Sequence, residues 1–145
     1  MNVDVLVLSN LAATLFLVGL AWFLQTVHLP LLRRAAAIDF AGCVKAQRAR
    51  NTALMALPML IELITGIWLL ATPLPHQDVF HAFLLLAIIW IVTLAGIVPL
   101  NSHLTHAYDE GALRGLIRWN WIRTLCWTAR AAIMTWITAG RLRIH

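Results

Sequence analysis

The stretch ALMALPMLIELITGIWLLA, residues 53–71, carries a single charged side chain, Glu62, near its middle. About 20 consecutive apolar residues in a helix span the roughly 30 Å hydrocarbon core of a bilayer. The stretch therefore predicts a transmembrane helix. A carboxylate at that depth costs about 2.5–3.5 kcal/mol on insertion scales, so Glu62 needs a partner, a ligand or a wet cavity.

The composition of the whole chain agrees with a membrane protein. Of its 145 residues, 61% are hydrophobic and only 12% are charged, whereas a soluble domain has about 25% charged residues. No polar stretch is long enough for a separate soluble domain, so we predict one transmembrane domain over residues 1–145. Cys43 and Cys126 form no CxxC pair, and the usual zinc, iron–sulfur and thioredoxin-like signatures are missing.

Several apolar segments of nearly span length follow one another along the chain. They predict an all-α, integral membrane, antiparallel four-helix bundle with short connections. The basic segment after the first span, Arg33–Arg50, fits a short interfacial helix. The predicted spans are residues 5–29, 52–72, 82–102 and 118–140.

The positive charges indicate the orientation of the chain, whose formal net charge is +5. Basic residues gather in the loops that face the cytoplasm, so we predict that the N- and C-termini lie outside and that the lipid bilayer is the main partner. No nucleic-acid-binding motif accompanies the charge, so we predict no nucleic-acid partner. The main basic cluster consists of Arg33, Arg34, Lys45, Arg48 and Arg50.

The fourth span carries polar and aromatic side chains at helical spacing. At about 100° per residue, four of them share one narrow stripe, which should face inward because lipid cannot solvate it. Trp127 then shields the arginines or stacks on a planar ligand. In the alternative interpretation, Arg123 reaches the cytoplasmic surface and Arg130 forms a purely structural ion pair. The stripe consists of Asn120, Arg123, Trp127 and Arg130.

Depth in the membrane predicts the partner of Glu62. This residue lies about ten residues, or about 15 Å, into the second span, and Arg130 lies at nearly the same depth in the fourth span. We therefore predict a Glu62–Arg130 contact. Pro58 frees the carbonyl of Leu54 from its usual hydrogen bond, which favours a kink.

Two histidines close the first and third spans. His28 and His103 are predicted to share a level at the cytoplasmic end, close to Asn120 and Arg123. Two imidazoles that face each other across a bundle can ligate haem or a transition metal. Two interfacial histidines can equally face solvent, so haem, a metal or no cofactor all stay open at this point.

Five short motifs contain these polar residues: His28-Leu-Pro30, Pro58-Met-Leu-Ile-Glu62-Leu, Val98-Pro-Leu-Asn-Ser-His103-Leu, Asn120-Trp-Ile-Arg-Thr and Trp127-Thr-Ala-Arg130. Together they look like the bacterial branch of the DUF1772 (anthrone oxygenase-like) membrane family, and the resemblance covers nearly the whole chain. It implies a small four-helix protein of the bacterial inner (plasma) membrane. Some fungal relatives are associated with the oxygenation of anthrones to anthraquinones, so the resemblance implies flat, hydrophobic aromatic substrates.

Our first hypothesis is a membrane oxidoreductase, oxygenase-like, that acts on a hydrophobic aromatic or quinone-like small molecule. The substrate would enter between helices, and Arg123 with Asn120 would stabilise a developing oxyanion. A histidine would serve as general base or as a haem or metal ligand. The candidate catalytic residues are Arg123, Asn120, Glu62 and Arg130, the candidate cofactor or metal ligands are His28 and His103, and the candidate substrate contacts are Trp121 and Trp127.

Two other functions compete with this hypothesis. The first is a non-enzymatic haem- or metal-binding subunit for electron transfer or for an accessory role in a larger complex. The second is a proton-coupled carrier that uses Glu62. Four short helices leave little cavity for alternating access unless the protein forms a homo-oligomer, and the chain shows no inverted repeat.

Overall fold

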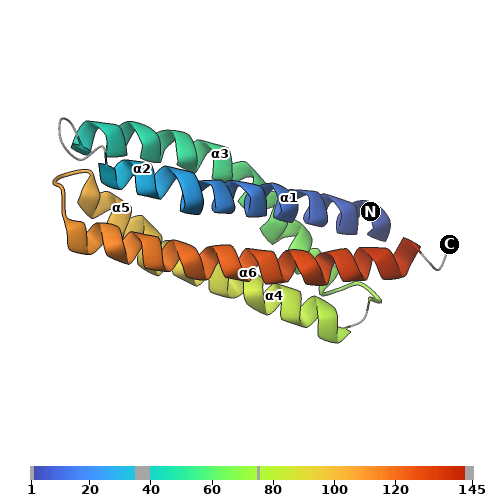
Figure 1. Cartoon of the computed structure of the whole chain (residues 1–145). Helices are drawn as coiled ribbons and strands as arrows, with labels where there is room; N and C mark the ends of the chain where they lie inside the picture. Colours follow the sequence, from blue (N-terminus) through green and yellow to red (C-terminus); the bar gives the residue numbers. More distant parts are fainter. Residues whose placement is uncertain (1, 35–39, 75, 143–145) are drawn as a thin grey trace.

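The computed structural model describes residues 2–34, 40–74 and 76–142, and all its regular elements in these ranges are helices. The helices join into four rods that run antiparallel (Figure 1). The predicted all-α architecture is confirmed. The rods are α1 (Val3–Phe23), η1 (Leu24–His28) and α2 (Leu29–Arg34); α3 (Phe40–Leu69); α4 (His76–Ile91), η2 (Val92–Ile97) and α5 (Val98–Leu104); and α6 (Glu110–Leu142).

Short polar side chains fix the beginnings of two helices. The Asn2 side chain accepts a hydrogen bond of 2.9 Å from the backbone N–H two residues later and so caps α1. Asp109 caps α6, because its Oδ1 accepts from the backbone N–H groups of Gly111 and Ala112 at 2.8 and 3.2 Å. The hydrogen bond from Ala112, followed by those from Gly111 and His103, lowers the pKa of Asp109 below its ordinary value.

Two of the rods contain a π-helical turn shortly before a proline. η1 ends at His28, just before Pro30, and η2 ends at Ile97, just before Pro99. Proline lacks the N–H that would bind the carbonyl four residues earlier, and its ring crowds that carbonyl. A wider turn accommodates this defect. Such turns are frequent at functional sites, and both of these line the cavity described below.

The rods pack unevenly around an apolar core. α1 packs on α3 and α6, and α4 packs on α6, whereas α3 and α4 touch only sparsely. Buried side chains form three clusters along the bundle. One lies at the α2 and α5 end and includes Leu104, one lies in the middle and includes Leu17, and one lies at the opposite end and includes Met134. The sparse contact of α3 with α4 leaves room between these two rods.

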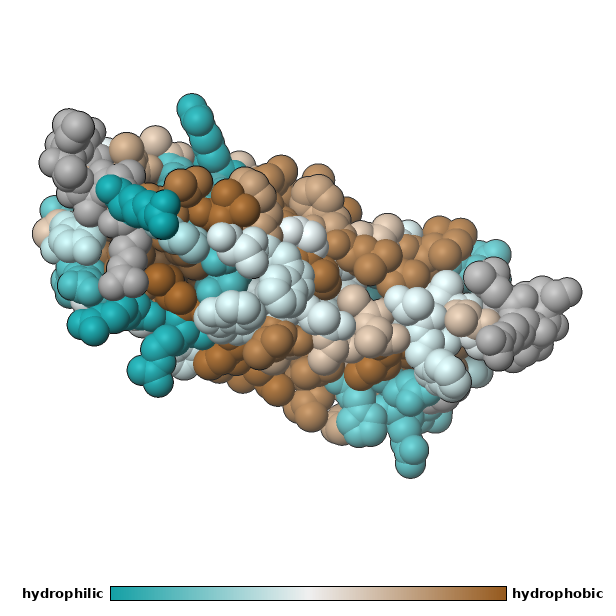
Figure 2. All heavy atoms as spheres, in the orientation of Figure 1, coloured by the Kyte–Doolittle hydropathy of each residue, from teal (hydrophilic) through white to brown (hydrophobic). Residues whose placement is uncertain are grey.

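The surface of the bundle suits a lipid environment. Three stretches of helix are long and apolar enough to cross a membrane: Val3–Leu32, Phe40–Leu69 and His76–Leu104. Large apolar side chains such as Leu57 and Trp136 point outward. Figure 2 shows a mostly hydrophobic middle with hydrophilic groups near both ends. These features indicate a membrane protein in contact with the bilayer.

Two sequence-based boundaries need correction. From Phe40 onward, the basic segment after the first span is not a separate interfacial helix but the first turns of α3, which continues without a break through Pro58. Its alanine, lysine, arginine and glutamine residues are strong helix formers, so nothing interrupts the helix there. Residues 35–39 lie outside the described residues. Most of the segment between 102 and 118 is also helical, because α5 ends at Leu104 and α6 begins at Glu110.

The first and last described helices meet at one end of the bundle. Figure 1 shows both chain ends on the same side as the turn between α3 and α4. An ion pair joins them, because Arg141 Nε donates to Asp4 Oδ1 at 2.7 Å. Residues 143–145 lie outside the described part of the chain. The end of the bundle that holds α2 and α5 is therefore opposite the termini.

Candidate functional site

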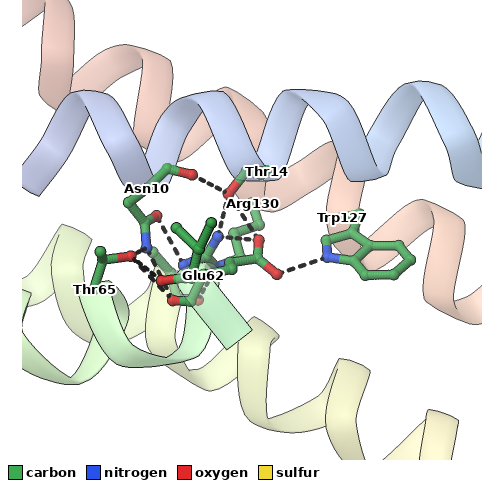
Figure 3. A network of polar contacts seen from close by, with 8 residues as sticks. Asn10, Thr14, Glu62, Thr65, Trp127 and Arg130 are labelled. Carbon is green, nitrogen blue, oxygen red and sulfur yellow. Dashed lines mark hydrogen bonds and ion pairs between the residues drawn. The ribbon is translucent and has the colours of Figure 1, made fainter. Parts of the chain in front are cut away.

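The predicted contact between Glu62 and Arg130 is confirmed. Arg130 Nη1 donates to Glu62 Oε1 in the middle of the bundle, and the two side chains are 0% and 1% exposed for Glu62 and Arg130 respectively. Figure 3 shows the pair between α1, α3 and α6. The equal depth of the two residues in antiparallel rods is enough to bring them together.

Every nitrogen of the Arg130 guanidinium has a partner. Its Nε donates to the backbone carbonyl of Ala82 at 3.0 Å, and its Nη2 donates to Asn10 Oδ1, also at 3.0 Å. Its Nη1 donates to Thr14 Oγ1 as well as to Glu62. This arginine therefore uses all three of its nitrogens as donors within the protein.

The Glu62 carboxylate is equally well satisfied. Thr14 Oγ1 lies 2.7 Å from Oε1, and the indole N–H of Trp127 donates to Oε2 at 3.1 Å. Asn10 Nδ2 donates to the backbone carbonyl of Glu62 at 3.0 Å and to Thr65 Oγ1 at 2.7 Å. The closed network leaves no oxygen of the carboxylate free, which favours a structural role for the pair over a catalytic one.

A second polar layer lies nearer the N-terminal end of α6, around Asn120 and Arg123. Asn120 Nδ2 donates to Gln25 Oε1 of η1 at 2.6 Å, and Arg123 Nη2 donates to Asn120 Oδ1 at 2.6 Å. All three side chains are buried. Asn120 therefore uses both ends of its amide to hold Arg123 in place, rather than to meet a substrate.

Trp127 connects the two layers. Its indole N–H reaches Glu62, and the Arg123 guanidinium carbon lies 5.1 Å from the centre of its ring, which is a cation–π distance. Trp127 is 0% exposed. The ion pair thus orients the ring on which Arg123 rests.

A cavity of about 450 Å³ opens next to Arg123. Its walls come from η1, α2, α3, α4, η2, α5 and α6, and they run through the space where α3 and α4 barely touch. Most of the wall is apolar. Its polar members include Arg123, Asn120, His28, Gln47 and Asn101.

Two residues in the wall of this cavity each carry a buried donor atom that has no partner in the described structure. The two atoms are Arg123 Nε and Trp90 Nε1, and they are the buried side-chain polar atoms left unpaired within the described residues. Arg123 is only 5% exposed, and its contacts are Asn120 and the Trp127 ring. Because an unpaired buried donor is unfavourable, the cavity is suited to a ligand that brings an acceptor.

The two histidines have different surroundings. His28 lines the cavity, and Gln47 Nε2 donates to its Nδ1 at 3.0 Å, which places the ring proton on Nε2. The side chain of His103 is 60% exposed, and its Nε2 lies 3.1 Å from Asp109 Oδ2 outside the cavity. The structure therefore does not bring them together as ligands, and this donor pair does not fit a haem or a metal.

A metal site is not apparent elsewhere either. Within residues 2–34, 40–74 and 76–142, no three His, Cys, Asp or Glu side chains gather where they could hold a metal ion. Cys43 is exposed and Cys126 is half-buried, and both are free thiols.

The predicted stacking residues do not line the cavity. Trp121 is on the outer surface, where its ring meets the edge of Trp22 with centroids 5.7 Å apart, and Trp127 is enclosed between the polar layers. The predicted substrate contacts at Trp121 and Trp127 are therefore not part of the cavity wall. Trp90 of α4 is the tryptophan in the cavity wall.

Sequence reasoning missed Asn10 and Thr14 as members of the polar network around Glu62. The spacing of Asn10 and Thr14 by one helical turn in an apolar stretch was the available signal. Uncharged polar residues carry a smaller insertion penalty than charged ones, so their inward position is less evident from the sequence.

The comparisons with known proteins add no relative. No family model matches the chain, and no curated protein or solved structure matches it at a significant level. The resemblance to the anthrone oxygenase-like family stays a prediction that rests on the motif residues.

Proposed function

We propose that this protein is a four-span membrane oxidoreductase, oxygenase-like, whose cavity binds a hydrophobic aromatic or quinone-like compound. One observation carries the proposal: Arg123 is buried in the wall of a mostly apolar cavity and forms no ion pair with the described residues. Arg130 shows how the chain completes a purely structural arginine, by pairing it with Glu62. The described residues supply no counter-ion for Arg123, so a bound compound is expected to supply the missing group.

The cavity suits a small aromatic molecule in size and access. Its volume of about 450 Å³ falls within the roughly 300–1,000 Å³ of ordinary ligand sites. Met55 and Met59 of α3 supply adaptable apolar wall opposite Trp90 of α4. The weak packing of α3 against α4 gives a hydrophobic compound a route from the lipid.

The chemistry begins with loss of a proton from a ring methylene that is conjugated with a carbonyl through the aromatic rings. The negative charge moves to the oxygen, where Arg123 stabilises it, while Asn120 keeps the guanidinium in place. His28 is the general base. A half-turn of the Gln47 amide would place its oxygen at Nδ1 and so favour the tautomer with the ring proton on Nδ1. His28 would reach this tautomer by proton exchange with water, which frees Nε2 to accept the substrate proton.

Dioxygen is the oxidant in this scheme. Oxidation of a ring methylene to a ketone consumes one O₂ and releases one water, so atoms and electrons balance. The Glu62–Arg130 pair takes no part in the reaction and positions Arg123 through Trp127.

The proposal includes a topology. We place α6 as the fourth span, with Arg123 and Arg130 turned into the bundle, both termini outside and the basic end of α3 in the bacterial cytoplasm. Lys45, Arg48 and Arg50 support this orientation, and the Asp4–Arg141 pair neutralises one of the cations at the opposite end.

Turnover of anthrone in lipid nanodiscs tests the function. We expect the wild-type protein to consume O₂ and form anthraquinone, and we expect Arg123→Gln to lower kcat/KM roughly 10²–10³-fold, as for loss of an oxyanion donor. Arg118→Gln removes an exposed arginine from the same helix and should keep the activity. An inactive wild-type protein, or equal activity in the two variants, would refute the proposal.

A further inference from the structure

The charge balance of α6 narrows the class of ligand. The helix buries two guanidinium groups, which are 1% exposed in Arg130 and 5% exposed in Arg123. Arg130 has the Glu62 carboxylate together with amide, hydroxyl and carbonyl acceptors. Arg123 has one amide oxygen and the face of Trp127, and neither of these carries a negative charge.

A neutral acceptor would satisfy hydrogen bonds of Arg123 but would leave its charge uncompensated. A buried cation that lacks a counter-ion is strongly unfavourable, and more so where lipid surrounds the bundle. An anion in the cavity compensates the charge and takes up the free donors together. The other nearby donor without a partner, the Trp90 indole N–H, belongs to the same cavity wall.

We propose that the cavity selects hydrophobic anions, with an ionised carboxylate or phenolate held by Arg123 and assisted by the Trp90 indole N–H. The apolar body of the ligand lies between α3 and η2, against Met55, Met59 and Ile97. This inference rests on the proposed function and adds to it only the ionised class of compound. It applies equally if the site binds such a compound without converting it.

A pair of matched probes tests the charge preference. 2-Naphthoate and 2-naphthamide share a ring system and a carbonyl group, but only the first is an anion at neutral pH. Their affinities are measured by quenching of tryptophan fluorescence in nanodiscs. Each probe is compared between wild-type and variant protein, so its partition into lipid cancels.

We expect Arg123→Gln to weaken 2-naphthoate roughly ten- to hundredfold, because hydrogen bonds to charged groups are the strong ones. The loss for 2-naphthamide should be smaller by at least about tenfold. Trp90→Phe keeps an aromatic ring and removes the donor, and it should weaken 2-naphthoate by about three- to tenfold. Arg118→Gln should leave both affinities unchanged.

Equal losses for the two probes in Arg123→Gln, or no binding of 2-naphthoate to the wild-type protein, would overturn the inference. If Arg123→Gln does not fold, Arg123→Met keeps a long side chain without the charge, and equal losses for the two probes in it would count equally against the inference. Selective binding without anthrone turnover would remove the proposed oxidoreductase and keep the anion site. Turnover of anthrone together with equal losses of affinity for the two probes would keep the proposed oxidoreductase and remove the anion site.

Discussion

At the scale of residues, the two buried arginines of α6 differ in the groups that satisfy their charge and their hydrogen-bond donors. Arg130 is enclosed by Glu62, Asn10, Thr14 and a backbone carbonyl, so its charge and its donors are satisfied within the bundle. Arg123 is held by Asn120 and rests on Trp127, and its Nε has no partner in the described structure. The first arrangement is complete within the bundle, and we propose that the second binds a ligand.

Breaking the closed pair should be strongly destabilising. Glu62→Gln leaves the Arg130 charge buried without its carboxylate, for which we expect a loss of about 3–5 kcal/mol in the free energy of unfolding. Unfolding by SDS titration in mild detergent micelles measures this loss. Asp4→Asn breaks the partly exposed pair with Arg141 and should cost at most about 1 kcal/mol.

The double variant Glu62→Leu/Arg130→Met tests whether the stability depends on the pair itself or only on the absence of an unpaired buried charge. It removes both ions and fills their space with apolar groups, so we expect it to regain most of the stability that Glu62→Gln loses. If the double variant is as unstable as Glu62→Gln, the pair stabilises the fold by more than mutual neutralisation of its two charges.

The sequence predicted the closed pair well and the open site poorly. Depth alone placed Glu62 beside Arg130, because a charge in the membrane has few possible partners. Depth does not fix the direction in which a side chain points, so His28 and His103 shared a level without facing each other. Trp127 was predicted to face inward, but only its contact with Glu62 reveals that it is enclosed.

At the scale of elements, close helix packing supports the cavity on one side. Gly96 lies in η2, and a Cβ atom added there would lie 2.5 Å from the ring of Trp119. Only a residue without a side chain lets this ring approach the helix. The π-helical turns and the cavity were not predicted, because Pro30 and Pro99 signal a local defect but not the shape that follows from it.

Alanine substitution of two helical glycines tests this packing. Gly96→Ala forces the rigid Trp119 ring to move, and we expect a loss of about 1–3 kcal/mol in unfolding free energy. Gly19 has open space around it, so Gly19→Ala should be neutral or stabilise by up to about 1 kcal/mol. The same SDS titration compares them, and an equal effect of the two substitutions would argue against the close approach.

The stability of the N-terminal turn of α6 should depend on pH through the ionisation of Asp109. The pKa of this carboxyl is lowered in the folded protein by the hydrogen bonds from Ala112, Gly111 and His103. Its stabilising contribution is therefore present above the unfolded pKa of about 3.9 and is lost as the pH falls through the lower folded value. We expect Asp109→Ala to lower Tm at pH 7, and this Tm difference to shrink below about pH 4. A difference that stays constant down to pH 3 would contradict this cap.

At the scale of the whole molecule, the bundle combines a closed polar middle with a cavity toward the α2 and α5 end. α1 and α6 form the well-packed side, whereas α3 and α4 are in loose contact and the cavity lies along α3. Composition and hydropathy predicted the helical membrane architecture, since those properties belong to whole segments. The uneven packing of the rods depends on many side chains at once and left no local signal in the sequence.

Native Cys43 tests the orientation of the bundle. This thiol is exposed near the start of α3, in the basic end that we place in the cytoplasm. In a Cys126→Ala background, a membrane-impermeant maleimide should label Cys43 in inside-out vesicles and not in right-side-out vesicles. Gln77→Cys in a background without Cys43, at the opposite end of the bundle, should give the reverse pattern. Labelling of both positions from the same side would exclude the four-span topology.

The most direct test of the division between the two arginines is the rise in Tm that 2-naphthoate causes, since a ligand of the native state stabilises it by mass action. We expect 2-naphthoate to raise Tm in the wild-type protein and in folded Glu62→Leu/Arg130→Met, and to leave Tm unchanged in Arg123→Gln. An equal rise in Arg123→Gln, or loss of the rise in the folded double variant alone, would contradict a site built on Arg123 and supported, but not formed, by the Glu62–Arg130 pair.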